Sequence, residues 1–192
     1  MWVSPAWAGA QTILVLGDSI SAAYGLPSID RGWVALLQRR LADSGARVVN
    51  ASIPGETTAG GLTRLAPLLV REKPAVVIVE LGANDGLRGL TLGQMKANLN
   101  GIVDQAQEAR AKVLLLGMRL PPNYGKRYAD AFAEIFARLA EERRIAYVPF
   151  LMDGVGGQRD MMQTDGLHPN EAAQTVMMEH VWSALQPLLK DD

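Results

Sequence analysis

Residues 12–21 read Thr12-Ile13-Leu14-Val15-Leu16-Gly17-Asp18-Ser19-Ile20-Ser21. The apolar half has the length and composition of a strand that is buried on both faces of a parallel sheet. The glycine, aspartate and serine that follow predict a turn at the carboxyl end of this strand, where open α/β sheets hold their ligands. Ser19 is therefore a candidate nucleophile, provided that the chain supplies a base to activate its hydroxyl.

The chain has two histidines, and their surroundings differ. His168 lies in the loop-like stretch Asp165-Gly166-Leu167-His168-Pro169, which carries its own carboxylate three residues upstream. Asp165 could accept the Nδ1 proton and direct the other ring nitrogen toward a serine, or it could only cap the turn that follows. His180 shares a helical stripe with apolar residues, which predicts a packed histidine. Ser19, His168 and Asp165 are thus a candidate triad.

Strand-like and helix-like segments alternate along the chain. Besides the first strand, apolar runs predict strands at 47–51, 75–81, 112–117 and 145–150. Helical spacing predicts helices at 33–42, 57–73, 91–110, 128–139 and 170–189, of which the second is expected to kink or split at Pro67. This alternation predicts a mainly parallel sheet with helices on both faces and right-handed crossovers.

Composition limits the possible classes of protein. At 192 residues, with 48% hydrophobic and 20% charged residues, the chain suits a single globular domain with its own core. A net charge of −1 provides no basic field for nucleic acid or an anionic membrane surface. The absence of cysteine excludes disulfides and thiolate catalysis. No run of about 18 apolar residues predicts a transmembrane segment.

Residues 1–10 are interpreted separately from the domain at 11–192. Ala8-Gly9-Ala10 fits the small-residue pattern of a signal-peptide cleavage site, although no basic region precedes it. We favour the remnant of a signal peptide over an unstructured N-terminus. Such a leader would direct the protein to the periplasm or out of a bacterial cell.

Acyl transfer also requires donors that stabilise an oxyanion. The loops at the predicted strand ends contain Gly55, whose N–H can be approached without a Cβ, and Asn84, whose side-chain amide can donate. The N–H of Ser19 is a third candidate. Glycine and asparagine also favour turns for conformational reasons, so a purely structural role stays open for both.

Four segments in this order resemble the SGNH hydrolases, also called the GDSL family. They are Gly17-Asp18-Ser19-Ile20, Pro54-Gly55-Glu56-Thr57, Gly82-Ala83-Asn84-Asp85 and Asp165-Gly166-Leu167-His168-Pro169. Residues 50–53, 79–89 and 119–125 resemble in particular the bacterial multifunctional thioesterase I/lysophospholipase/arylesterase subfamily. Ile20 stands where the usual first motif has leucine. The resemblance covers the chain from about Gln11 to its end.

The resemblance implies a fold, a mechanism and site residues. The fold would be a three-layer α/β/α sandwich with a five-stranded, flavodoxin-like parallel sheet. Ser19 would be the nucleophile, His168 the base and Asp165 its orienting carboxylate, while Ser19, Gly55 and Asn84 would form the oxyanion hole. The expected enzyme hydrolyses small-molecule acyl esters and thioesters, needs no metal or cofactor, and acts as a monomer.

An acyl chain needs an apolar groove beside Ser19. We expect two stretches to form it, 118–124 and 150–152 together with 161–162. Methionines adapt to irregular ligands, and glycines at 154, 156 and 157 would allow the second stretch to move. The alternative is that these side chains only pack the core. The candidate substrate-binding residues are Met118, Leu120, Pro121 and Met152.

Two other functions remain open at this point. A carbohydrate-deacetylating esterase would keep the triad without a preference for long acyl chains. A flavodoxin-like binding module would share the fold and bind FMN, but it would have no use for Asp165 and His168. The natural substrate, the preferred chain length and the choice between esters and thioesters are not encoded in any motif.

Overall fold

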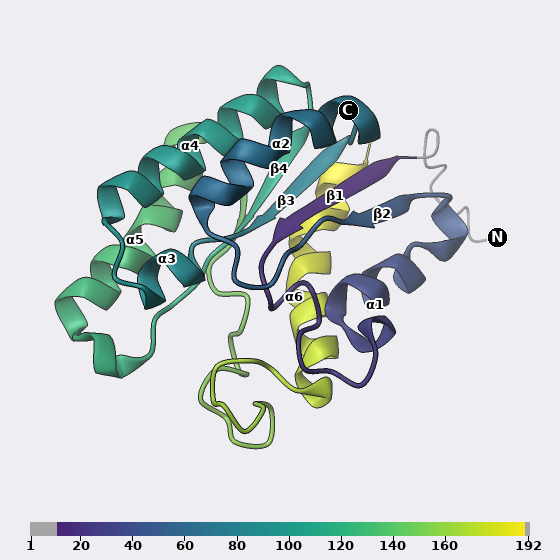
Figure 1. Ribbon diagram of the computed structural model, residues 1–192. Helices are drawn as coiled ribbons and strands as arrows, with labels where there is room; N and C mark the ends of the chain where they lie inside the picture. The colour runs from purple at the N-terminus through teal and green to yellow at the C-terminus, as the bar shows by residue number, and fades with distance from the viewer. Residues whose placement is uncertain (1–10, 191–192) are drawn as a thin grey trace.

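Five parallel strands form the central sheet, in the order β2-β1-β3-β4-β5, in the computed structural model, which describes residues 11–190 (Figure 1). The strands are β1 (Thr12–Gly17), β2 (Arg47–Asn50), β3 (Val76–Glu80), β4 (Lys112–Leu116) and β5 (Ala146–Val148). β1 and β3 are buried almost throughout because helices cover both faces of the sheet. The predicted α/β/α sandwich with its flavodoxin-like strand order is therefore confirmed. The interpretation of residues 1–10 as a leader remnant lies outside the described residues.

The helices form two layers, as Figure 1 shows. α1 (Trp33–Arg40) and α6 (Gln174–Leu185) pack together on one face, and α2 (Thr58–Glu72), α4 (Leu92–Glu108) and α5 (Lys126–Arg143) cover the other. The helices bury apolar stripes, which in α4 include Met95, Leu99, Ile102, Val103 and Ala106. No helix within residues 11–190 combines the length and the apolar character needed to cross a bilayer.

Pro67 lies inside one continuous helix, α2, so the expectation that the helix would split there is wrong. The proline is exposed, whereas Leu65, Leu68 and Leu69 around it are buried. A proline removes one backbone donor from the helix, and this buried stripe holds the helix together across the gap.

Two other segments differ from the prediction. Residues 83–87, expected to be a loop, form the short helix α3 (Ala83–Leu87). The predicted helix at 170–189 is an α-helix only over α6, with 3-10 turns at Glu171–Ala173 and Gln186–Leu189 on either side. Pro187 has no N–H for an α-helical hydrogen bond, which accounts for the change at the second end.

The carboxyl ends of β1 and β3 bring the candidate residues to one edge of the sheet. Gly17 and Glu80, the last residues of these strands, are register partners. The long connection 149–170, drawn in green below the sheet in Figure 1, returns from β5 to the same edge. The candidate site lies where this connection meets the turn after β1.

Candidate active site

Ser19, His168 and Asp165 form a continuous hydrogen-bonded chain. Ser19 Oγ lies 2.9 Å from His168 Nε2, and His168 Nδ1 lies 2.7 Å from Asp165 Oδ2. Both distances suit proton transfer from a hydroxyl to an imidazole that is held by a carboxylate. The structure thus brings the three predicted triad residues together, although they come from opposite ends of the chain.

Asp165 orients the imidazole and closes its own turn at the same time. Its Oδ1 accepts the backbone N–H groups of Leu167 and His168, at 2.9 and 3.0 Å. Partial burial works against ionisation, but these backbone donors and the imidazole outweigh it and lower the pKa of Asp165 to about 2. The carboxylate is therefore charged throughout the working range of a histidine base.

The turn after β1 presents the nucleophile in one defined conformation. Asp18 is 1% exposed, and its Oδ1 accepts the N–H of Ile20 at 3.0 Å. The carbonyl of Ser19 accepts the N–H of Tyr24, and the carbonyl of Gly17 accepts the N–H of Ile53. Ser19 thereby sits between two buried, hydrogen-bonded neighbours, with its hydroxyl directed to His168.

The turn that contains Gly55 reaches the same edge of the sheet. Glu56 N–H donates to the carbonyl of Ile53 and closes the turn, in which Gly55 has a φ of +78° that favours glycine. Arg88 Nη2 donates to the carbonyl of Gly55 at 2.8 Å and helps to fix this residue. Gly55 is not among the residues that line the cavity described below, so it flanks that cavity.

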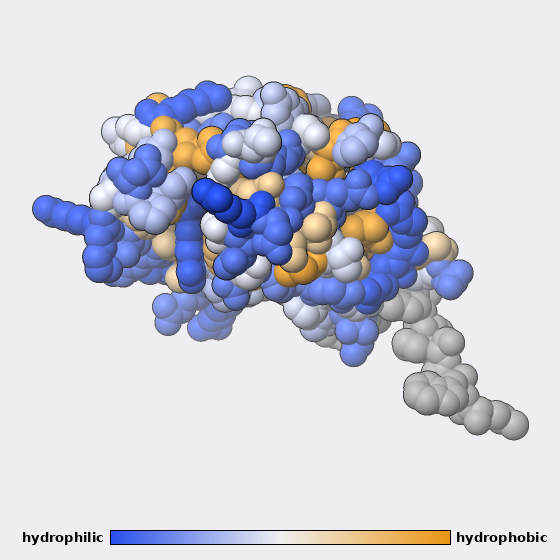
Figure 2. All heavy atoms as spheres, turned by 90° about the horizontal axis from the view of Figure 1, so that it is seen from below, coloured by the Kyte–Doolittle hydropathy of each residue, from blue (hydrophilic) through white to orange (hydrophobic). Residues whose placement is uncertain are grey.

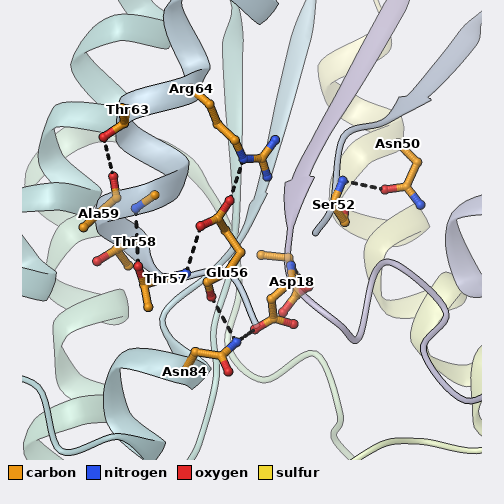
Figure 3. Close-up of polar contacts among 12 residues, drawn as sticks. Asp18, Asn50, Ser52, Glu56, Thr57, Thr58, Ala59, Thr63, Arg64 and Asn84 are labelled. Atoms are coloured by element: carbon orange, nitrogen blue, oxygen red, sulfur yellow. Dashed lines mark hydrogen bonds and ion pairs between the residues drawn. The ribbon is translucent and has the colours of Figure 1, made fainter. Parts of the chain in front are cut away.

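The Asn84 amide lies between two acceptors, as Figure 3 shows. Its Nδ2 donates to Asp18 Oδ2 and to the carbonyl of Glu56, each at 3.0 Å. The amide is therefore rigidly oriented, but an oxyanion would have to share a donor that Asp18 or Glu56 already accepts. Sequence reasoning placed Asn84 at the site and missed these two partners.

A cavity of about 550 Å³ adjoins the triad, and Ser19, Asn84 and His168 are part of its wall. All four predicted substrate-binding residues line it: Met118, Leu120, Pro121 and Met152. The residues of the two predicted stretches that are not in the wall are Asn123, Tyr124, Leu151 and Met161. Figure 2, the view from below, shows hydrophobic patches set among hydrophilic side chains on that side of the molecule. Apolar neighbours that were not predicted are Ile20, Leu87 and Leu167.

Two further groups near the triad were not predicted. The ring of Tyr24 packs on the His168 imidazole, and Glu80 accepts the N–H of Asp18. Tyr24 has no local sequence pattern that marks it. Glu80 could have been noticed as the one acidic residue in an otherwise apolar buried strand.

The second histidine lies away from the triad, and no set of metal ligands gathers within the described residues. His180, on α6, is half-buried with Nδ1 3.1 Å from the carbonyl oxygen of Leu151, and it does not line the cavity. This agrees with its interpretation as a packed histidine. Within residues 11–190, no three His, Asp or Glu side chains gather as ligands for a metal ion.

Comparison with known proteins yields named relatives over nearly the whole chain. The chain is 57% identical to the esterase TesA of Pseudomonas aeruginosa over 184 residues, which cover 95% of this chain and 91% of that protein. It is 44% identical to thioesterase 1/protease 1/lysophospholipase L1 of Escherichia coli K12, over 96% of this chain and 88% of the relative. An arylesterase of Vibrio mimicus is 41% identical over 93% of this chain and 90% of its own length.

The fold of this chain agrees with the solved structure of one of these relatives. A crystal structure of TesA superimposes with a TM-score of 0.90 at 57% identity, covering 93% of this chain and 99% of that one. The model of the GDSL-like lipase/acylhydrolase family matches residues 15–176, which include every segment from the nucleophile turn to the loop with His168. The predicted resemblance is confirmed, and the chain belongs to the GDSL-like lipase/acylhydrolase family.

Proposed function

We propose that this protein is a serine hydrolase that cleaves carboxylic esters and thioesters of acyl chains through an acyl-enzyme intermediate. The observation that carries the proposal is the Ser19 Oγ to His168 Nε2 distance of 2.9 Å at the wall of an apolar cavity. Relatives that are named esterase, thioesterase/lysophospholipase and arylesterase support the same range of substrates.

The proposed chemistry follows from the geometry of the triad. Ser19 Oγ attacks the acyl carbon while His168 Nε2 takes its proton, and the charged Asp165 stabilises the imidazolium. The imidazolium then protonates the leaving alcohol or thiol, which departs. His168 next removes a proton from water, which attacks the acyl-enzyme. The bond to Ser19 Oγ then breaks, the imidazolium returns the proton to Oγ, and the carboxylic acid leaves.

The oxyanion formed in each half-reaction needs hydrogen-bond donors. We assign this role to the N–H groups of Ser19 and Gly55 and to the Asn84 amide. In the proposed transition state, the oxyanion shares the amide donor that now points to Asp18 Oδ2. The amide is already oriented by Glu56, so little reorganisation is required.

The cavity favours acyl chains over acetyl groups alone. Met118, Leu120, Pro121 and Met152 provide apolar walls that an acetyl group could not fill, and each methylene that leaves water contributes about 0.8 kcal/mol. A carbohydrate-deacetylating esterase is therefore the second candidate, because it would leave this volume unused.

The site of action and the oligomeric state are part of the proposal. Ala8-Gly9-Ala10 supports export to the periplasm or the medium, where lysophospholipids and other esters are available. We further propose that the enzyme is a monomer, in which one chain carries the complete triad. Cell fractionation and sedimentation of the purified protein test these two statements.

A hydrolysis panel tests the function directly. We expect turnover of p-nitrophenyl esters, an acyl-CoA and a lysophospholipid, and covalent labelling of Ser19 by an organophosphorus probe. Ser19→Ala should abolish turnover and labelling together. Labelling at another residue, with Ser19→Ala still active, would exclude the mechanism.

A further inference from the structure

Glu80 is a fully buried carboxyl group beneath the nucleophile turn, and none of the catalytic steps above uses it. Its Oε2 accepts the N–H of Asp18 at 3.2 Å and the hydroxyl of Ser21 at 2.6 Å. A Cβ at Gly17 would lie 2.8 Å from this oxygen. The turn can therefore close over Glu80 only because residue 17 is glycine.

The surroundings of Glu80 favour its uncharged form. Its Oε1 is buried and receives no hydrogen bond from any residue within 11–190. An ionised carboxylate is costly in such a site, whereas a protonated one can itself donate. Burial, together with the neighbouring carboxylate of Asp18, raises the pKa of Glu80 well above its usual value.

Asp18 is the group to which Glu80 can donate. Because the Asp18 N–H reaches Glu80, a protonated Glu80 can donate to the neighbouring Asp18 carboxylate, and Asp18 in turn holds the Asn84 amide through Oδ2. Burial raises the pKa of Asp18 to about 6, against the hydrogen bonds from Ile20 and Glu80 and the attraction of His168. The shared burial thus favours a pair that holds one proton and one negative charge, with the proton on Glu80.

We propose that Glu80 is a positioning residue that acts as an uncharged acid, sharing its proton with Asp18 and thereby aiming Ser19 and the Asn84 amide. The proposal rests on the roles assigned above to Ser19 and Asn84. Glu80 does not line the cavity, so it should influence kcat and not KM. Glutamine can make the same contacts without a charge, so it should replace Glu80.

Glu80 and Asp18 also make the stability of the fold depend on pH. A carboxyl group that stays protonated in the folded protein binds more protons there than in the unfolded chain. The free energy of unfolding therefore falls as pH rises above the ordinary values of 4.5 for Glu80 and 3.8 for Asp18. The fall caused by Asp18 ends near its folded pKa of about 6, and the raised pKa of Glu80 adds a fall in the same direction. The other groups that act on the pair are Ser21, Ile20, Asn84 and His168.

The experiment compares Glu80→Gln, Glu80→Ala and the exposed control Glu134→Gln in the full-length chain. Glu80→Ala should lower kcat roughly 10- to 100-fold at constant KM, because a misaimed nucleophile costs rate and not binding. Glu80→Gln should retain kcat within about threefold and lose less thermal stability than the unsubstituted chain as the pH rises above 4.5, the ordinary pKa of a glutamate. Glu134→Gln should change neither kcat nor this pH dependence.

Two results would overturn the proposal. One is a kcat for Glu80→Gln as low as that for Glu80→Ala, which would mean that a charge is needed. The other is a pH dependence of stability that Glu80→Gln leaves unchanged, and this measurement decides the matter even if Glu80→Ala does not fold. An unsubstituted chain that hydrolyses no ester would instead contradict the proposed function, while the stability measurement would still test the charge state of Glu80.

Discussion

The ring of Tyr24 packs against the imidazole of His168, with the ring centroids 4.8 Å apart and the planes inclined by 45°. The N–H of Tyr24 donates to the carbonyl of Ser19, and its own carbonyl accepts from Gln163 Nε2 at 2.8 Å. One residue thus connects the nucleophile turn to the loop with the base. An aromatic face beside an imidazole stabilises the positively charged form, which is the form that follows attack by Ser19.

Replacing Tyr24 should therefore slow the chemical step. Tyr24→Leu should lower kcat roughly 2- to 5-fold, the equivalent of about 0.5 to 1 kcal/mol, because the imidazolium that follows attack has lost the ring. Tyr24→Phe keeps the ring and should retain kcat. A loss of equal size in both variants would assign the effect to the hydroxyl.

The parts of the site that sequence could predict are those with local patterns. Asp165 and His168 are three residues apart, and Ser19 directly follows an apolar strand, so each carries its context in the neighbouring residues. The parallel sheet could be predicted for the same reason, because alternation of strands and helices along the chain determines how they layer.

The missed features depend on contacts between distant segments. α3 is rich in residues that form helices poorly, and it is held by Asp85, which accepts the N–H and the hydroxyl of Thr58 at 2.9 and 2.6 Å. Asn84 meets Asp18 across 66 positions. No periodicity within a short window encodes such pairs.

Asp165→Asn should reduce kcat by roughly 10³- to 10⁴-fold, because an amide can favour the wrong tautomer of the imidazole.

Asp165, with a pKa of about 2, keeps its charge down to low pH, so its protonation cannot cause the acidic loss of activity. Only a neutral imidazole can take the proton of Ser19, so the histidine that serves as the base should be the one whose removal abolishes activity. His180→Ala should retain most activity, and an inactive His180→Ala with an active His168→Ala would mean that the base is misassigned.

Asn84→Ala should fold and lose roughly 10²- to 10³-fold in kcat, the usual effect of removing one oxyanion donor. Asn123→Ala, at an exposed position in the neighbouring 3-10 turn Pro122–Tyr124, is the control and should leave kcat unchanged. Steady-state kinetics on one ester separate a role of Asn84 in the transition state, which changes kcat, from a role in substrate binding, which changes KM. A rise in KM at constant kcat would place Asn84 in ground-state binding of the substrate.

Chain-length selectivity should respond to polar substitutions in the cavity wall. Leu120 and Met152 are each 9% exposed and line the cavity beside the triad. Leu120→Asn or Met152→Gln should lower kcat/KM for decanoate esters and spare acetate esters, since each buried methylene contributes about 0.8 kcal/mol. The comparison is the ratio of decanoate to acetate hydrolysis in each variant.

The matched control for this prediction is Leu151, which is fully buried next to Met152 but does not line the cavity. Leu151→Ala should lower the melting temperature, because it leaves a hole in the core that costs roughly 2 to 5 kcal/mol, and it should leave the decanoate to acetate ratio unchanged. Because a general loss of packing affects short and long esters alike, only a wall of the acyl site can change the ratio. Equal losses on both esters in Leu120→Asn and Met152→Gln would show that these residues support the fold and that the acyl chain binds elsewhere.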